Sequence, residues 1–231
     1  MKKTSLIAWV LLAGFTVVSG LKAQTALAAD EKWLLETIEK NIDPFADIAM
    51  DIWKYAEVGY QEYKSSQLLQ DKLKSEGFEL ETGVAGIPTA FVASYGSGKP
   101  VIAILGEFDA LPGVSQAALP YREARPEVNA GHACGHHLFG SGSAAAAASV
   151  KQWMEKNNIQ GTLRFYGTPA EEGGAGKVYM VREGLFDDVD AVLHWHPGSS
   201  NSASASSSLA NKSAKFRFYG IASHAAASPW N

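Results

Sequence analysis

An unbroken apolar run, Val101-Ile-Ala-Ile-Leu105, constrains the fold more than any other feature of this sequence. A strand that alternates polar and apolar residues can leave one face in water, whereas a strand that is apolar throughout must be covered on both faces. Patterns with apolar residues three and four apart, typical of helices, occur before and after it. Strands that alternate with helices in this way predict an α/β fold.

The remaining elements follow from the same periodicities. Within the first helical stretch, Asp43-Pro44 predicts a new helix start, because Asp is a good N-cap and Pro fits the first helical position. The predicted strands are 78–81, 90–94, 101–105, 162–167 and 190–195, and the predicted helices are 31–59, 65–76, 138–156 and 177–183.

The first 29 residues have the layout of a secretory signal peptide. Lys2 and Lys3 precede an apolar run over residues 6–18, and small residues follow up to a cleavage site after Ala28. The alternative is a membrane anchor, although the apolar run is shorter than the roughly 20 residues that a spanning helix needs. We therefore expect an exported protein, periplasmic or secreted, with no membrane contact after cleavage.

Cys134 is the only cysteine, so no disulfide can form within the chain. In an oxidising compartment a lone thiol needs another explanation. One alternative is a small buried apolar residue, which is the commonest state of a free cysteine. The net charge of −4 argues against a nucleic-acid partner, which would require a basic face.

Potential metal ligands are concentrated in three short segments. Cys134 and His136 share a glycine-flanked histidine cluster, His194 and His196 flank Trp195, and Glu171-Glu172 follows a predicted strand. Nitrogen and sulfur donors combined with carboxylates are the set that zinc prefers. In an α/β fold the carboxyl ends of the strands collect such residues on one surface. These segments together predict a metal site.

The acidic residues could divide the chemical work. One of Glu171 and Glu172 could bind metal while the other accepts a proton from the attacking water. Asp109, which ends the most buried predicted strand, could orient a ligand histidine. The alternatives are an ordinary solvated helix start for the glutamates and an N-cap or turn residue for Asp109.

Several motifs resemble one family of hydrolases, the aminoacylase/carboxypeptidase-type metallopeptidases. The resemblance runs from about residue 30 to residue 231, and the Cys-Gly-His form is that of the amidohydrolase branch, closest to aminobenzoyl-glutamate utilisation protein B-like proteins. It implies a zinc-peptidase-like catalytic domain with a mixed, mostly parallel sheet flanked by helices. The motifs are Tyr55-Ala-Glu57-Val-Gly-Tyr-Gln-Glu62, Glu107-Phe-Asp109-Ala-Leu-Pro112, His132-Ala-Cys134-Gly-His136, Pro169-Ala-Glu171-Glu172-Gly, Trp195-His196-Pro197-Gly198 and Ser223-His224-Ala-Ala.

The resemblance also implies residue roles. Cys134 would bridge two divalent ions, zinc or alternatively manganese, as a thiolate. His136 would bind one ion and Glu172 the other. Glu171 would be the general base, and Asp109 would orient the site.

Three further histidines complete the expected site. The fourth ligand is His196 or His194, with His196 favoured because it directly precedes a proline, as the corresponding ligand does in several branches. His224 would reach the neighbouring subunit of a homodimer and stabilise the oxyanion. The expected domains are an incomplete catalytic domain over residues 30–212 and the beginning of a smaller α+β lid and dimerisation domain over residues 213–231.

The resemblance implies hydrolysis of the amide bond of N-acyl or N-aroyl amino acids, such as p-aminobenzoyl-glutamate, or of small dipeptides. A catalytically inactive, truncated metal-binding scaffold of the same fold is the alternative, and we expect these 231 residues alone to be poorly active. A Cys134 nucleophile with His136 as its base is a third and weaker hypothesis, because the adjacent acids suit metal ligation better.

Overall fold

The computed structural model describes residues 28–203 and, beyond them, residues 207, 210, 212, 214–217, 219 and 226. The chain divides into two compact units, Met1–Pro197 and Gly198–Asn231. The described positions of the second unit form no helix or strand. Residues 1–27 of the predicted signal peptide, His224 and most of the predicted lid segment 213–231 lie outside the described residues.

The described part of the first unit contains a five-stranded mixed sheet in the order β1-β2-β6-β3-β7. Strand β2 is antiparallel to both β1 and β6, whereas β3 is parallel to β6 and to β7, so four of these strands run in one direction. This confirms the mixed, mostly parallel sheet. The bounds are β1 Glu79–Thr82, β2 Phe91–Ser97, β3 Val101–Gly106, β6 Gly161–Gly167 and β7 Ala191–Leu193.

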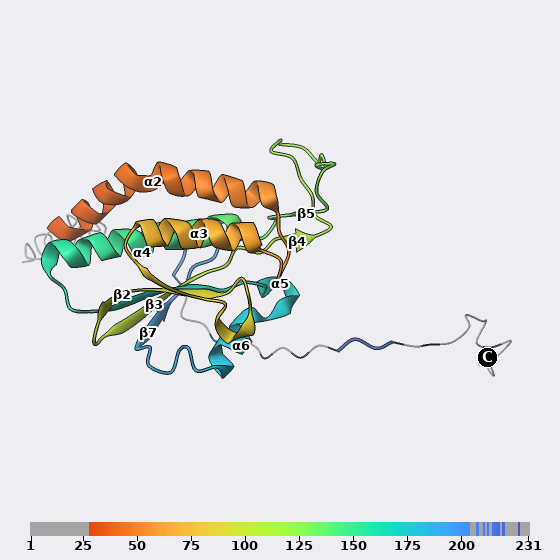
Figure 1. Ribbon diagram of the computed structural model, residues 1–231. Helices are drawn as coiled ribbons and strands as arrows, with labels where there is room; N and C mark the ends of the chain where they lie inside the picture. Colours follow the sequence, from red (N-terminus) through yellow and green to blue (C-terminus); the bar gives the residue numbers. More distant parts are fainter. Residues whose placement is uncertain are drawn as a thin grey trace, which may run out of the picture. The chain divides into compact units, whose positions relative to one another are not determined.

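Helices cover both faces of this sheet (Figure 1). The long helices lie together on one face, and the shorter α6 lies on the other with the 3-10 turn η1. A small two-stranded sheet, β4–β5, lies beyond the ends of the main strands. The bounds are α2 Ala29–Tyr55, α3 Tyr63–Ser75, η1 Val84–Gly86, β4 Leu111–Pro112, β5 Ala130–Gly131, α4 His136–Asn157, α5 Glu171–Gly174 and α6 Gly176–Arg182.

Strand β3 is buried on both faces, as its composition predicts. Ile104 packs into the cluster formed with α2, α3 and α4, while Ala103 and Leu105 pack into the cluster that includes η1 and Met180 of α6. Successive side chains of a strand point to opposite faces, so an apolar residue at every position supplies both cores.

The predicted helix break at Asp43-Pro44 is wrong. Helix α2 runs without interruption from Ala29 to Tyr55, with Pro44 inside it. A proline in a helix interior removes one backbone hydrogen bond and crowds the preceding turn. Buried residues lie on both sides of it, Thr37 before and Phe45, Ala49 and Ile52 after, and the packing of Phe45 and Ile52 in the core outweighs the local preference. Every helix among the described residues is too short or too polar to span a bilayer.

Candidate metal centre

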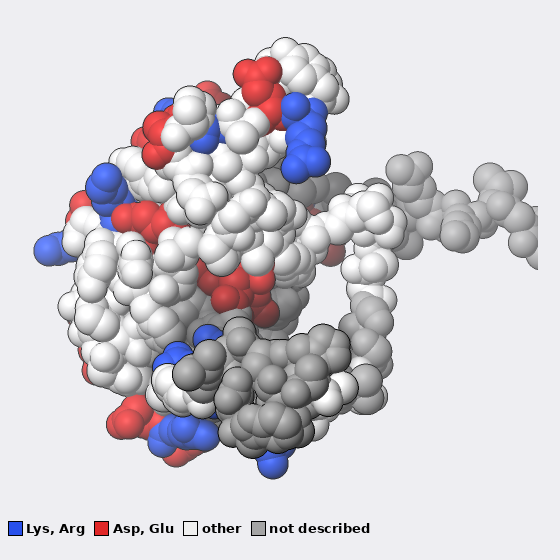
Figure 2. All heavy atoms as spheres, turned by 90° about the vertical axis from the view of Figure 1, so that its right-hand side faces the viewer, with Lys and Arg blue, Asp and Glu red and all other residues white. Residues whose placement is uncertain are grey.

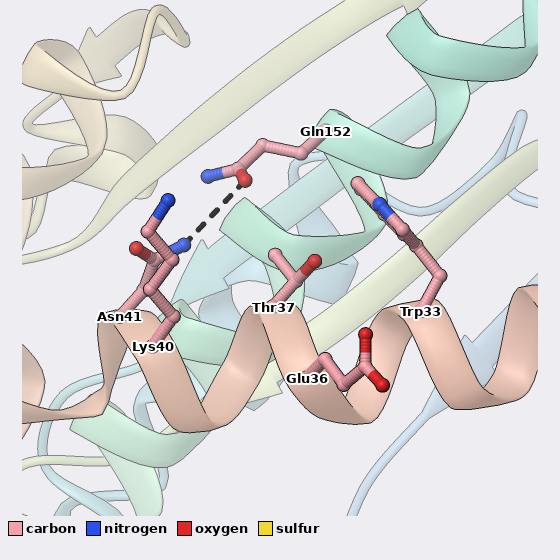
Figure 3. A pocket seen from close by; sticks show the side chains of 6 residues that line it. All are labelled: Trp33, Glu36, Thr37, Lys40, Asn41 and Gln152. Carbon is pink, nitrogen blue, oxygen red and sulfur yellow. Dashed lines mark hydrogen bonds between the residues drawn. The ribbon is translucent and has the colours of Figure 1, made fainter.

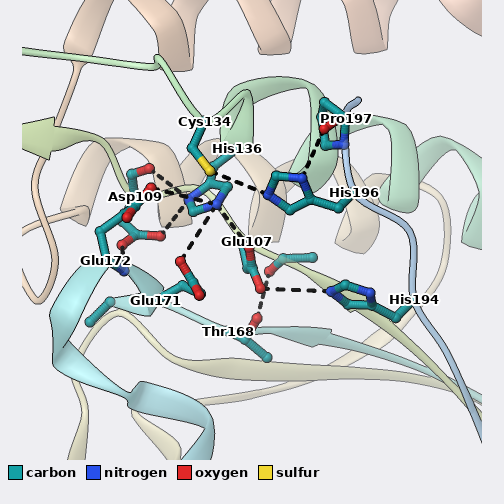
Figure 4. A network of polar contacts seen from close by, with 12 residues as sticks. Glu107, Asp109, Cys134, His136, Thr168, Glu171, Glu172, His194, His196 and Pro197 are labelled. Carbon is teal, nitrogen blue, oxygen red and sulfur yellow. Dashed lines mark hydrogen bonds and ion pairs between the residues drawn. The ribbon is translucent and has the colours of Figure 1, made fainter. Parts of the chain in front are cut away.

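The predicted site residues meet at the carboxyl end of the sheet (Figure 4). Glu107 and Asp109 follow β3, Glu171 and Glu172 follow β6, and the segment with His194 and His196 follows β7. Cys134 and His136 lie at the start of α4. Strands β3, β6 and β7 run parallel, so the segments that leave their carboxyl ends converge on one edge.

His136 is completely buried at the centre of this cluster. Its Nδ1 lies 3.0 Å from the backbone oxygen of Asp109 and 3.0 Å from Asp109 Oδ1. Both neighbours are acceptors, so Nδ1 carries a proton, and Nε2 is the nitrogen left for a metal ion. Nε2 lies 2.9 Å from Glu107 Oε2, 3.8 Å from Glu171 Oε2 and 3.9 Å from Glu172 Oε1. Nε2 therefore faces the carboxylates.

Asp109 connects two of the predicted ligands. While Oδ1 accepts from His136, Oδ2 accepts a hydrogen bond from the backbone N–H of Glu172 at 2.8 Å. This carboxylate therefore holds both the imidazole plane and the backbone of the acidic segment, which is the geometry expected of an orienting residue.

The structure places His196, rather than His194, beside Cys134. His196 Nε2 lies 3.4 Å from Cys134 Sγ, and its Nδ1 donates to the backbone oxygen of Pro197 at 2.9 Å. One donor atom each from Cys134, His136 and His196 lies within 4.8 Å of the others. His194 turns toward Glu107 Oε1, at 3.8 Å. Of the two candidate histidines, His196 is therefore the one that lies with Cys134 and His136.

Two contacts bring His196 to this position. Trp195 Nε1 donates to Ser143 Oγ at 3.0 Å, which anchors the segment after β7 to α4. Gly135 lies against Pro197, and a Cβ at position 135 would approach Pro197 Cβ to 2.9 Å. Gly135 also has φ of 80°, which favours glycine. The glycine between Cys134 and His136 therefore permits the close approach of His196.

Glu107 and Lys177 belong to the site, although the sequence patterns assign neither of them a role. Glu107 is buried, and one of its oxygens pairs with Lys177 of α6 while the other faces His136 Nε2. One sequence feature could have indicated Glu107. It lies two residues before Asp109 after a buried strand, and side chains two residues apart in an extended segment point to the same side. Lys177 lies far along the chain from both acids, and no sequence pattern connects them.

The charges of the cluster shift several pKa values. Burial opposes ionisation of Glu107, but His136 and Lys177 outweigh it and lower the pKa of Glu107 to about 2. Burial likewise disfavours the imidazolium, yet Asp109 and Glu107 raise the pKa of His136 to about 10. Burial and the surrounding carboxylates raise the pKa of Cys134 to about 11. Negative charge therefore dominates the cluster.

The residues present fit a divalent cation. Glu107 Oε2, His136 Nε2 and Glu172 Oε1 are buried atoms that make no hydrogen bond of good geometry, although Glu107 Oε2 and His136 Nε2 lie 2.9 Å apart. Buried polar atoms normally have hydrogen-bond partners, so the convergence of these atoms with further carboxylates suits a ligand of positive charge. A cation would also favour the thiolate of Cys134, because a coordinating thiol loses its proton. Figure 2 shows acidic side chains gathered near the middle of the face on the side of α5 and β4.

The other two histidines near Cys134, which are His132 and His137, make different contacts. His132 and His137 pack against one another with ring centroids 5.0 Å apart, and His132 Nε2 lies 3.1 Å from the backbone oxygen of Ile52. Burial lowers the pKa of both to about 4. Both rings are therefore neutral, and they contribute to packing against α2.

A separate polar pocket lies between the first half of α2 and the second half of α4 (Figure 3). Asn41 Nδ2 donates to Gln152 Oε1 across it at 3.5 Å. Its lining contains neither histidine nor cysteine, and it lies away from the carboxyl ends of the strands, so we assign it no part in the metal centre. The lining residues are Trp33, Glu36, Thr37, Lys40, Asn41 and Gln152.

Comparisons with known proteins find related sequences. Residues 103–226 match the sequence model of peptidase family M20/M25/M40. The chain is 48% identical over 200 residues to one of the subunits of p-aminobenzoyl-glutamate hydrolase from Escherichia coli K12, covering 86% of this chain and 41% of that protein. It is 30% identical over 227 residues to Xaa-Arg dipeptidase of Mus musculus, covering 89% of this chain and 48% of that protein.

A solved structure shares the fold. The YXEP protein of Bacillus subtilis, described as a dinuclear metal binding peptidase from the M20 family, matches with a TM-score of 0.54 and 26% identity. The match covers 68% of this chain and 42% of that one. The chain thus spans less than half the length of each of these relatives.

Proposed function

Because this chain belongs to peptidase family M20/M25/M40, we propose that it carries the metal centre of a hydrolase of N-acyl or N-aroyl amino acids. p-Aminobenzoyl-glutamate is the first substrate to test, and small dipeptides are the second, since relatives of the chain are named for such substrates. The observation that carries the proposal is the convergence of Cys134, His136 and His196 beside the paired glutamates.

Four side chains would hold the cations. Cys134, His136 and His196 present sulfur and imidazole donors, and Glu172 presents a buried carboxylate oxygen. This donor set suits zinc first, with manganese as the alternative, and a bridging thiolate suits two ions. When bound, such ions polarise the substrate carbonyl and lower the pKa of water.

Glu171 is the general base in this proposal. Its side chain is 45% exposed and its Oε2 lies 3.8 Å from His136 Nε2, so it borders both the centre and solvent. Burial, together with the charges of Glu107 and Glu172, raises the pKa of Glu171, which improves it as a proton acceptor near neutral pH. Glu171 removes a proton from the attacking water and delivers it to the leaving amine nitrogen.

The surrounding residues keep these groups in place. Asp109 fixes the tautomer of His136 and the backbone of Glu172, and Lys177 neutralises Glu107 behind the imidazole. His224, outside the described residues, is proposed to donate to the oxyanion from the partner subunit of a dimer. Export after cleavage at Ala28 is proposed from the signal-like N-terminus and would leave Ala29, where α2 begins, as the first residue.

Metal analysis and hydrolysis assays with the purified full chain test the proposal. We expect bound zinc or manganese and slow but measurable release of p-aminobenzoate from p-aminobenzoyl-glutamate, because these 231 residues alone are expected to be poorly active. Glu171→Gln should retain the metal and lose turnover by about 100-fold or more, the scale of general-base catalysis. Glu183→Gln, at an exposed glutamate, is the matched control. A protein without metal, or Glu171→Gln with wild-type turnover, would contradict the proposal, and metal without hydrolysis would favour the inactive scaffold.

A further inference from the structure

The segment that precedes α3 packs directly against the turn that carries both catalytic acids. We call residues 170–174 the acid turn. Glu62, the residue before α3, is completely buried, and its Oε1 accepts a hydrogen bond from the backbone N–H of Ala170 at 2.8 Å. Its Oε2 accepts from Thr89 Oγ1 at 3.0 Å. Both carboxylate oxygens of this buried residue therefore accept hydrogen bonds.

The acid turn has a backbone conformation that needs support. Ala170 has φ of 56° and ψ of 43°, the left-handed region that residues with a Cβ seldom adopt. Glu172, two residues on, has ψ of 70° and departs from helical geometry. Such conformations persist only where surrounding contacts determine them. The hydrogen bond from Ala170 to Glu62 is one such contact, immediately before Glu171.

A second hydrogen bond holds the other end of the acid turn. Tyr60 Oη donates to the backbone oxygen of Gly174 at 2.5 Å. The packing between the two segments is close, because a Cβ at Gly59 would lie 3.1 Å from Ala170 Cα and Cβ. A Cβ at Gly174 would approach Tyr60 Cε2 to 2.8 Å. Residues 59–62 thus contact both ends of the acid turn and form hydrogen bonds with each end.

The chemistry of Glu62 suits a positioning role. Burial raises the pKa of Glu62, and the backbone N–H of Ala170 and the hydroxyl of Thr89 are among the groups that oppose this rise. Because Glu62 adjoins the first turn of α3, its backbone is fixed by a regular element, and it transmits that rigidity to the acid turn. The metal ligands themselves do not contact it through any of the hydrogen bonds described.

We infer that Glu62, assisted by Tyr60, is a positioning residue that holds the acid turn so that Glu172 can bind metal and Glu171 can act as base. This inference rests on the proposed function. Loss of the Glu62 acceptor would leave the Ala170 N–H buried without a partner and release the left-handed conformation. Outer hydrogen-bond partners of metal ligands are worth about 10- to 100-fold in metal affinity or activity, and Glu62, which acts through Ala170, corresponds to the lower end of this range.

Zinc affinity of the full chain, measured by competition with a chromophoric chelator, provides the test. We expect Glu62→Ala to lower zinc affinity about 10-fold or more. Glu62→Gln, which keeps a carbonyl oxygen for the Ala170 N–H, should remain within about threefold of wild type. Ser66→Ala is the control, because it removes two buried hydrogen bonds of Ser66 Oγ on α3, one to the backbone oxygen of Thr89 and one from Gln70 Nε2, without touching the acid turn.

Two further measurements separate positioning from general stability. Hydrogen exchange at the Ala170 amide should accelerate in Glu62→Ala and not in Ser66→Ala, with zinc absent. The visible spectrum of the Co²⁺ form should change in Glu62→Ala, since the ligand geometry changes, and remain like wild type in Glu62→Gln. If Glu62→Ala does not fold, Tyr60→Phe at a partly exposed side chain takes its place, with an expected loss of about 10-fold.

The outcomes distinguish this inference from the proposed function. Wild-type protein that binds neither zinc nor manganese would overturn the proposed function and this inference together. Wild-type protein that binds zinc, with affinity unchanged in folded Glu62→Ala or in Tyr60→Phe, would overturn the inference alone. Equal losses in Glu62→Gln and Glu62→Ala would also overturn it, because the acceptor would then not be the decisive group.

Discussion

Asp109→Asn is the substitution that most directly tests how the centre is held together. Asp109 accepts hydrogen bonds at both side-chain oxygens, from His136 Nδ1 at 3.0 Å and from the backbone N–H of Glu172 at 2.8 Å. An asparagine of the same shape has one oxygen and one NH₂ group. Its NH₂ must therefore face one of two donors, whichever way the amide is turned.

The magnitude follows from these contacts. A buried hydrogen bond to a charged group is worth about 1.5–3 kcal/mol, and here the substitution replaces one such bond by a contact between two donors. If His136 changes tautomer to relieve that contact, the proton moves to Nε2 and blocks the lone pair that faces the carboxylates. A loss of about 2 kcal/mol corresponds to a zinc affinity about 30-fold weaker.

The assay is a zinc competition titration on folded, metal-stripped protein, with Asp47→Asn as the matched control at an exposed aspartate of α2. We expect Asp47→Asn to bind zinc like wild type. An affinity of Asp109→Asn within about threefold of wild type, a difference of under 1 kcal/mol, would show that this carboxylate does not orient the site.

Four further outcomes are expected. His196→Ala should weaken the thiolate-to-Co²⁺ absorption band and metal binding far more than His194→Ala, and the reverse order would contradict the ligand assignment from the 3.4 Å contact with Cys134. Because burial raises the folded-state pKa of Glu62, this group's contribution to stability is complete below the unfolded-state value of about 4.5 and is lost as pH rises through the folded-state value. Glu62→Gln should therefore gain stability relative to wild type as pH rises from about 4 to about 8. The measurement is the urea midpoint of each metal-free protein, and a difference between the two midpoints that does not change over this pH range would contradict the burial argument. Phe165→Ala should lower the free energy of unfolding by about 3–5 kcal/mol, since this ring is fully buried and lies against Phe91, and a loss below about 1 kcal/mol in urea denaturation would refute the packing argument. N-terminal sequencing of protein exported from a bacterial host should begin at Ala29, and an intact N-terminus would contradict the proposed cleavage.

Much of the fold could be predicted from local patterns. The apolar run at Val101 became the doubly covered strand β3, and the helix predicted over 138–156 became α4. These predictions succeed because burial imposes a period of two on strands and 3.6 on helices. The predicted break at Pro44 is wrong because the long-range packing of Phe45 against the core outweighs the local preference for a new helix start.

The candidate site was predictable in its donors and less so in its contacts. Cys134, His136, Glu171 and Glu172 carry recognisable chemistry in short motifs, and the structure brings them together. His194 and His196 remained ambiguous because both would share a face if the strand continued. In the structure β7 ends at Leu193, and the segment after it turns the two rings toward different partners.

The sequence by itself determined the kinds of elements and the kinds of ligands, because periodicity and side-chain chemistry are local properties. Only the tertiary structure decided which nitrogen of His136 faces the carboxylates, which histidine approaches Cys134, and that buried Glu107 pairs with Lys177. It also placed Glu62 in hydrogen-bonding contact with the acid turn, which lies more than a hundred residues away in the chain. These relationships depend on how parallel strands and their helices pack, and packing is a property of the whole fold rather than of any segment.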